Sequence, residues 1–269
     1  MPYVCPVHES MIRSRSNEGP RTACVRAQAD ETLDSFYRGR VFVLQSKRGY
    51  RFALDAALLA DFVRPRPGDE LLDLGAGNGI ISLLLSLKPF ARATLIEIQG
   101  SLAALARRNL VLNGLEEKMT LIQGDFRRYR PGAKFDVVFS NPPYIEKRTG
   151  FVSASAEKAV AKHELKCDIL GIMRTTARLL KKDGRAYFVY PARRRGDLER
   201  AAKASGLCLR RLRFVHPRKS EEACLFLAEL GFTPTGARVL PPLVLRDARG
   251  RDTAEARRIF EGRDRGRAS

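Results

Sequence analysis

The stretch "DLGAGNG" combines residue types and a spacing that suit the binding of a nucleoside. An acid, Asp73, comes first, and three glycines follow at alternate positions, Gly75, Gly77 and Gly79. Because glycine has no Cβ atom, it allows both a tight turn and the close approach of a ligand. A dinucleotide-binding loop would place a glycine at position 80, which is Ile80 here, and Asp73 would repel a phosphate. The loop therefore favours an adenosine that carries an ammonium and a sulfonium group over a dinucleotide.

Two further acids stand at the ends of the apolar stretches that follow. Glu97 lies at the end of "ATLIEI", where a carboxylate can accept hydrogen bonds from both ribose hydroxyls. Asp125 lies in "QGDF", after the next stretch, and is expected beside the adenine ring as an acceptor for its amino group. Phe126 is expected to pack either against that ring or in the hydrophobic core. Each feature alone is common, but three at successive strand ends indicate a cofactor site.

The stretch "NPPY" directly follows the apolar run "FDVVFS" and joins an amide, two rigid residues and an aromatic ring. The side-chain oxygen of Asn141 and the carbonyl oxygen of Pro142 can each accept one N–H bond from a planar amino group, whose delocalised lone pair otherwise makes it a poor nucleophile. Pro142 and Pro143 hold the loop rigid without donating hydrogen bonds, and Tyr144 can stack on a planar base. In-line attack on a sulfonium methyl group would then depend mainly on positioning. The alternative is a Pro-Pro turn with an incidental tyrosine.

Alternating apolar segments must position these residues. Strand patterns are predicted at 70–74, 93–98, 119–123, 135–140, 184–190, 209–215 and 224–230, and helices at 79–88, 101–113, about 157–182 and 192–205. Such an alternation indicates an α/β fold with a parallel sheet that is covered by helices on both faces. The last two strands are joined only by "HPRKSEEA", too short for a parallel crossover, so they are expected to be antiparallel. The candidate residues follow strand ends and are therefore expected at one edge of the sheet.

Three regions are expected along the chain. Residues 1–32 are polar and aperiodic and are predicted to be disordered. Residues 33–245 form the main domain. Residues 246–269 are charged and are predicted to form a mobile tail.

The main domain is expected to begin and end with small additions. Residues 41–45 and 47–52 have the pattern of a hairpin, and an amphipathic helix is predicted at 53–63. Residues 239–245 can add a strand, which Pro241 and Pro242 confine to the edge of the sheet.

The charge balance points to a polyanionic partner. The 269 residues include 49 Lys and Arg against 30 Asp and Glu, which leaves a net charge of +19. Such an excess attracts nucleic acid, although a generally basic proteome would produce the same balance. No apolar run reaches the ~18 residues of a membrane span, and the N-terminus lacks the apolar centre of a signal peptide, so a cytoplasmic protein without a membrane partner is expected. Five Cys without a C-x-x-C pair and three distant His predict no metal site.

Residues 69–145, with "LLDLGAGNG", Glu97 and Asp125, resemble the class I S-adenosylmethionine-dependent methyltransferases. The resemblance implies S-adenosyl-L-methionine as the cofactor, with Glu97 as the ribose acid and Asp125 as the adenine acid. It also implies a Rossmann-like, seven-stranded mixed sheet of order 3-2-1-4-5-7-6, in which strand 7 is antiparallel. That arrangement agrees with the short connection between the last two predicted strands.

The motif "NPPY" is similar to those of methyltransferases that act on adenine N6, on guanine N2 or on a glutamine amide in release factors. The segments "LQSKRGYRFALDAALLADFV", "NPPYIEK" and "VHPRKSEEACLFLAEL" resemble the bacterial family of tRNA adenine-N6 methyltransferases that modify the adenosine 3′ of the anticodon in a valine tRNA. This resemblance covers residues 36–245 and implies tRNA as the partner. Release-factor glutamine methyltransferases share the core but carry a longer helical N-terminal domain. Methylation of a protein glutamine or of guanine in rRNA, and a noncatalytic RNA-binding protein with this fold, are the alternatives.

Ten cations in four segments of the chain are candidates for RNA contacts. They are Lys47, Arg48, Arg51, Lys147, Arg148, Arg193, Arg194, Arg195, Arg218 and Lys219. Each alone is more often a solvated surface charge than a ligand, so the hypothesis depends on their clustering. The sequence leaves the oligomeric state open, with a monomer favoured.

Overall fold

The computed structural model describes residues 25–47, 54–143, 169–234 and 236–262, and predictions for other residues lie outside these ranges. Within them, the central sheet contains the seven predicted strands and two short additions. The seven strands are β3 (Glu70–Leu74), β4 (Arg92–Glu97), β5 (Met119–Gln123), β6 (Phe135–Ser140), β7 (Leu180–Pro191), β8 (Cys208–Arg218) and β9 (Leu225–Gly231). Their order is β5-β4-β3-β6-β7-β9-β8, and β9 runs antiparallel to both of its neighbours. The order and the antiparallel last strand are therefore confirmed.

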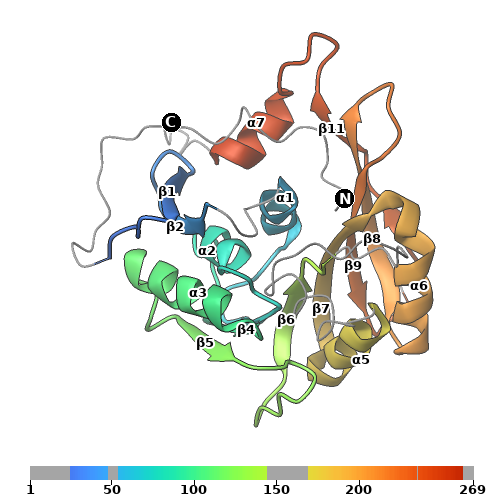
Figure 1. Cartoon of the computed structure of the whole chain (residues 1–269). Helices are drawn as coiled ribbons and strands as arrows, with labels where there is room; N and C mark the ends of the chain where they lie inside the picture. The colour runs from blue at the N-terminus through green and yellow to red at the C-terminus, as the bar shows by residue number, and fades with distance from the viewer. Residues whose placement is uncertain (1–24, 48–53, 144–168, 235, 263–269) are drawn as a thin grey trace, which may run out of the picture.

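Helices cover both faces of this sheet, because the side chains of its inner strands are apolar on both sides. In β6, Val137 belongs to the core that includes α1 (Leu54–Phe62), α2 (Ile80–Leu85) and α3 (Gly100–Leu112), whereas Val138 belongs to the core that includes α5 (Ile169–Leu179) and α6 (Arg195–Ala204). A short 3-10 helix, η1 (Ala192–Arg194), precedes α6. Figure 1 shows the two groups of helices around the strands. No helix in the described ranges is long and apolar enough to cross a membrane.

A two-stranded hairpin precedes the sheet, but its pairing differs from the prediction. β1 (Glu31–Phe36) pairs antiparallel with β2 (Val41–Ser46), so β2 has a partner that comes before it in the chain, whereas most of the predicted partner, residues 47–52, lies outside the described residues. Tyr37 and Arg38 form the turn with positive φ angles of 53° and 58°, which non-glycine residues rarely adopt. The sequence consequently carried no clear signal for this turn. The hairpin packs on α3, and β1 begins within the segment that was predicted to be disordered.

Two helices also differ from the prediction. α1 is not amphipathic, because β7, α2 and the C-terminal helix surround it and bury all of its residues except Asp61. The helix predicted at 157–182 ends at Leu179, and β7 begins at the next residue. The earlier part of that predicted helix lies outside the described residues.

The chain after β9 adds two strands and a helix, which corrects the prediction of a mobile tail from residue 246. β10 (Arg238–Val239) and β11 (Leu243–Arg246) both pair parallel with β8, as predicted for an edge that is interrupted by two prolines. α7 (Ala254–Glu261) follows, and its Ala256 and Ile259 are buried against the main core. Residues 263–269 lie outside the described part.

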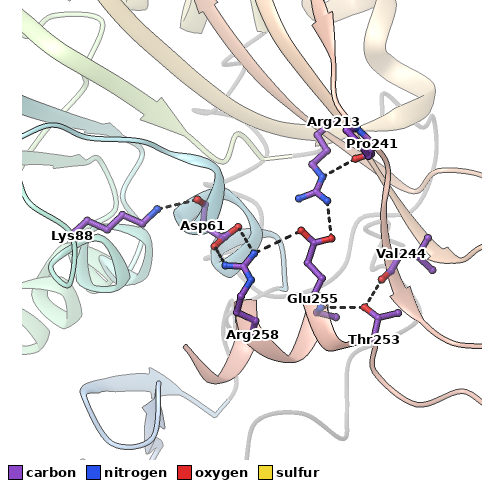
Figure 2. A network of polar contacts seen from close by, with 9 residues as sticks. Asp61, Lys88, Arg213, Pro241, Val244, Thr253, Glu255 and Arg258 are labelled. Atoms are coloured by element: carbon purple, nitrogen blue, oxygen red, sulfur yellow. Dashed lines mark hydrogen bonds and ion pairs between the residues drawn. The ribbon is translucent and has the colours of Figure 1, made fainter. Parts of the chain in front are cut away.

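Polar contacts hold α7 in place (Figure 2). The Thr253 hydroxyl accepts a bond from the N–H of Ala256 and so caps the start of the helix. Arg258 pairs with Asp61 of α1 at 3.0 Å, and Glu255 pairs with Arg213 of β8 at 2.8 Å. Two of the charges that made this segment look mobile, those of Glu255 and Arg258, are thus neutralised by partners in the main domain.

Candidate cofactor and substrate site

The glycine loop between β3 and α2 has the open backbone that the sequence predicts. Gly75, Gly77 and Gly79 have positive φ angles of 74°, 60° and 85°. At Gly75 and Gly77, no atom of the described residues lies within 4 Å of the position that a Cβ atom would take, so a ligand can approach the backbone there. At Gly79, a Cβ atom would meet Leu95 of β4 at 3.4 Å and Ala106 of α3 at 3.6 Å, so this position faces the protein and not open space.

Asp73, at the end of β3, is completely buried. Its Oδ2 accepts a hydrogen bond of 2.8 Å from the Ser82 hydroxyl of α2, which ties together the two elements that flank the loop. Its Oδ1 has no hydrogen-bond partner within the part of the chain that the structure describes. Burial raises the pKa of Asp73 to about 7; the Ser82 bond opposes this rise, and the charge of Glu97 adds to it. A buried acid with one unpaired oxygen suits a ligand that carries positive charge.

Glu97, at the end of β4, is held by backbone N–H groups. Its Oε2 accepts a bond from Gly77 and its Oε1 accepts a bond from Gln99, each at 2.8 Å. Burial raises the pKa of Glu97, and these two bonds act in the opposite direction. Each carboxylate oxygen keeps a further lone pair. The side chain is therefore fixed beside the glycine loop and can still accept hydrogen bonds from a ligand.

Backbone hydrogen bonds join the ends of β3, β4 and β5. The N–H of Gly75 donates to the carbonyl of Ile96 at 2.9 Å, and the N–H of Gly124 donates to the carbonyl of Glu97 at 2.8 Å. Asp125 follows Gly124 directly. The structure thus brings the predicted cofactor residues together along one edge of the sheet, while their contacts with a ligand stay predictions.

Arg127 holds Asp125, the predicted adenine acid. The main-chain N–H, Nε and Nη2 of Arg127 donate to its carboxylate over distances of 2.7 to 3.0 Å. The side-chain bond from Arg127 is the main cause that lowers the pKa of Asp125, so this group is an ionised acceptor at neutral pH. Phe126 is buried in the core with Leu72 and Ile96. Of the two roles predicted for Phe126, the structure supports core packing.

The end of β6 is fixed against the end of β3. The buried Ser140 hydroxyl donates a hydrogen bond of 2.7 Å to the carbonyl oxygen of Leu74, the last residue of β3. Asn141 comes next and is half-buried, Pro142 is buried and Pro143 is exposed. Asn141, the first residue of the predicted substrate stretch, therefore directly follows a residue that is bonded to β3, the strand that leads into the glycine loop.

Tyr144, the last residue of that stretch, lies outside the described residues, and its stacking on a base stays a prediction. The same holds for four of the predicted RNA contacts, Arg48, Arg51, Lys147 and Arg148.

Several of the other predicted RNA contacts are paired with protein groups. Three ion pairs have N–O distances of 3.0, 2.6 and 2.6 Å, in the order Arg194 with Asp197, Arg195 with Glu199, and Arg218 with Glu221. Lys47 donates to the carbonyl of Ala29 at 2.8 Å. The three arginines therefore offer less free charge than the sequence indicates.

Sequence reasoning missed Asn109 of α3 and Asn113, the C-cap residue of the same helix. Asn109 bonds to the main chain of Leu44 in β2, and Asn113 bonds in the same way to Phe42. Asn109 also donates to the carbonyl of Asn78 in the glycine loop. The available signal was the spacing of four residues, which places two amides on one face of a helix.

The described residues fit a positively charged adenosyl group. Open space lies in front of Gly75 and Gly77, an unpaired oxygen belongs to Asp73, and two further acids, Glu97 and Asp125, follow along the same edge. Among the described residues, no three His, Cys, Asp or Glu side chains gather as they would around a metal ion. The absence of a metal from the whole protein stays a prediction.

Comparisons with known proteins place the chain among the methyltransferases. Residues 51–195 match the model of the family described as methyltransferase small domain. A protein of Aliivibrio fischeri named tRNA1(Val) (adenine(37)-N6)-methyltransferase is 28% identical over 187 residues, which cover 69% of this chain and 79% of that protein. A protein of the same name from Vibrio cholerae is 24% identical over 225 residues, which cover 83% of this chain and 92% of that protein.

A solved structure has the same fold. It is described as a predicted O-methyltransferase from Agrobacterium tumefaciens and superposes with a TM-score of 0.57 at 22% sequence identity. The match covers 76% of this chain and 94% of that chain. At this identity the likeness concerns the fold alone.

Proposed function

The chain belongs to the methyltransferase small domain family, whose model spans more than half of it, and we propose that it methylates the N6 amino group of an adenine in tRNA. It is an S-adenosylmethionine-dependent methyltransferase. The observation that carries the proposal is the bond from Ser140 to Leu74, which holds Asn141 beside the strand that leads into the glycine loop. Cofactor and amino group would thereby meet at one edge of the sheet.

Each candidate residue has a distinct task in this proposal. The cofactor supplies a methyl group on a positively charged sulfur when it is bound. Asp73 favours that charge, Glu97 accepts bonds from the ribose and Asp125 accepts a bond from the adenine amino group of the cofactor. These contacts orient the methyl group and do not take part in bond making.

Asn141 and Pro142 act on the substrate. The side-chain oxygen of Asn141 and the carbonyl oxygen of Pro142 accept the two N–H bonds of the target amine and direct its lone pair at the methyl group. Catalysis then comes from positioning and from preorganised dipoles. No strong base is required before attack, because the methylated amine is acidic and releases a proton to water afterwards.

Two observations support a tRNA substrate. The relatives from Aliivibrio fischeri and Vibrio cholerae are both named tRNA1(Val) (adenine(37)-N6)-methyltransferase. The net charge of +19 also favours a polyanion over a protein amide. We therefore take adenine 37 of a valine tRNA as the target and the cytoplasm as the place of action. A release-factor glutamine and a guanine of rRNA are the alternative substrates with a planar amino group.

Transfer of label from methyl-labelled cofactor to unmodified tRNA tests the proposal. Nucleoside mass spectrometry of the product should recover the label as N6-methyladenosine. If the label were recovered as methylguanosine, or only in a release factor, the substrate would be guanine or a protein glutamine and not adenine. If calorimetry detected no cofactor binding, the noncatalytic alternative would hold.

Asn141→Ala separates chemistry from binding. The variant should lose a factor of ~10² to 10³ in turnover, as is typical when a preorganised dipole is removed, and should keep the cofactor affinity of the wild type. Unchanged turnover would contradict the role of Asn141.

A further inference from the structure

The turn after β5 carries arginines that the proposed methyl transfer does not use. Residues 125–134, "DFRRYRPGAK", contain four cations and one acid. Arg127 is paired with that acid, Asp125. Arg128 and Arg130 are exposed, and neither has a carboxylate partner among the described residues. The turn therefore presents positive charge that this part of the chain does not neutralise.

A further arginine, Arg178 in the last turn of α5, reaches the same turn. Its guanidinium donates to the carbonyls of Tyr129 at 2.7 Å, Phe126 at 3.2 Å and Arg127 at 3.3 Å. Arg130 donates to two of these carbonyls, those of Arg127 at 2.8 Å and Tyr129 at 3.0 Å. Two guanidinium groups consequently share two carbonyl oxygens, without a carboxylate on either group within the described ranges.

This arrangement holds like charges close together. Burial lowers the pKa of Arg178, and the nearby charge of Arg130 lowers it further. Carbonyl oxygens carry only partial charge and do not neutralise two full positive charges. An anion with several oxygens would relieve the repulsion.

Arg130 also has hydrogen-bond donors to spare. Its two bonds within the described residues both come from Nη1, which leaves Nε and Nη2 available on an exposed side chain. Nε–H and Nη2–H form the flat edge of a guanidinium that matches two oxygens of a phosphate.

We propose that Arg130, together with Arg178 and Arg128, binds a phosphate group of the RNA backbone. The inference rests on the proposed RNA substrate and names a second contact for it, away from the target base. The turn starts at the cofactor edge, where the N–H of Arg128 donates to the carbonyl of Asp125 at 2.9 Å. It then leads toward the amino ends of β6 and β7, where Tyr129 contacts Phe135 and Arg178 lies two residues before β7. An RNA whose base reaches Asn141 would therefore contact Arg130 with a more distant part of its backbone, beyond the carboxyl edge of the sheet.

The salt dependence of tRNA binding tests the phosphate contact. Arg130→Gln keeps a donor for the shared carbonyls but removes the charge and the flat edge. Arg200→Gln is the matched control, because Arg200 is an exposed arginine of α6 that is already paired with Asp197. Fluorescence anisotropy should show tRNA binding about three- to tenfold weaker for Arg130→Gln, with the slope of log affinity against log salt smaller by ~0.7 to 0.9. The control should change neither quantity, and calorimetry should give the same cofactor affinity for all three proteins.

Two results would overturn the inference. If Arg130→Gln kept the wild-type slope of log affinity against log salt and had a lower melting temperature, the cluster would only stabilise the fold. If inorganic phosphate bound the wild type and not the variant, and the salt dependence of tRNA binding did not change, the site would be one for a free anion. Failure of the inference is distinct from failure of the proposed function, because only the latter would abolish tRNA binding and methyl transfer by the wild type.

Discussion

The side chain of Asn109 donates a hydrogen bond of 3.0 Å to the carbonyl oxygen of Asn78 in the glycine loop. The same amide accepts a bond from the N–H of Leu44 at 2.7 Å and donates to the carbonyl of Leu44 at 3.1 Å. Asn109 is fully buried, and both of its amide protons are used. One side chain therefore connects the hairpin strand β2 to the loop that is expected to hold the cofactor.

Asn109→Ala should weaken cofactor binding as well as stability. The loss of the bond to Asn78 frees the glycine loop, for which we expect about tenfold weaker cofactor binding, or ~1.4 kcal/mol. Asn113→Ala is the control, because Asn113 bonds to Phe42 in β2 and makes no bond to the glycine loop. Calorimetric titration should separate the two variants, while urea unfolding should show a loss of ~1 to 3 kcal/mol in both. Equal cofactor affinities would contradict the coupling.

Asp73→Asn should change the dependence of stability on pH. The pKa of Asp73 is about 7 in the folded protein and lies near 4 in an unfolded chain. Between these pH values the folded state keeps a proton that the unfolded chain has released, so Asp73 lowers the free energy of unfolding as the pH rises. The stability of the variant relative to the wild type should therefore increase by ~1 to 4 kcal/mol between pH 4 and pH 8. Urea unfolding at several pH values measures this change.

Asp125→Asn supplies a control of opposite sign. Arg127 lowers the pKa of Asp125, so this carboxylate contributes stability above its unfolded pKa and loses it as the pH falls through the folded value. The variant should be less stable than the wild type at neutral pH, with a difference that shrinks in acid. If the stability of both variants relative to the wild type followed the same trend with pH, at least one of the two pKa shifts would be wrong.

Cofactor binding should release a proton near neutral pH. A positive charge beside Asp73 favours the ionised carboxylate and so lowers its pKa from about 7. Affinity should then rise by up to about tenfold between pH 6 and pH 8. Titration calorimetry in two buffers of different ionisation enthalpy counts the protons released, and Asp73→Asn should release none. A pH-independent affinity in the wild type would argue against contact between Asp73 and the cofactor charge.

Lys88→Met should destabilise the fold without touching the site. The ammonium of Lys88 donates to the carbonyls of Ala60 at 2.6 Å, Asp61 at 2.9 Å and Val63 at 2.7 Å, at the C-terminal end of α1. Figure 2 shows the bond to Asp61. These charged bonds satisfy carbonyls that have no partner within the helix. We expect a loss of ~1 to 3 kcal/mol in urea unfolding. The exposed Lys182 is the control, and Lys182→Met should stay within about 0.5 kcal/mol of the wild type.

The sequence by itself determined the alternation of strands and helices, the antiparallel last pair and the place of the site, and the order of the sheet came from the resemblance to a family. Strand and helix periodicities, the three glycines and the short final connection are local properties of the chain, and parallel strands bring their carboxyl ends to one edge. For that reason Asp73, Glu97, Asp125 and Asn141 were expected together before their positions were known.

Only the tertiary structure decided which side chains meet. The pairing of β2 with β1 depended on a turn at Tyr37 with an unusual backbone conformation. The packing of α7 on the main domain depended on partners such as Asp61, which is far away in the sequence. Composition likewise does not distinguish Arg195, neutralised by an acid one helical turn away, from Arg130, which shares carbonyls with another cation. Charge and polarity are visible in a sequence, whereas pairing is a property of the folded chain, because it depends on distances that only packing sets.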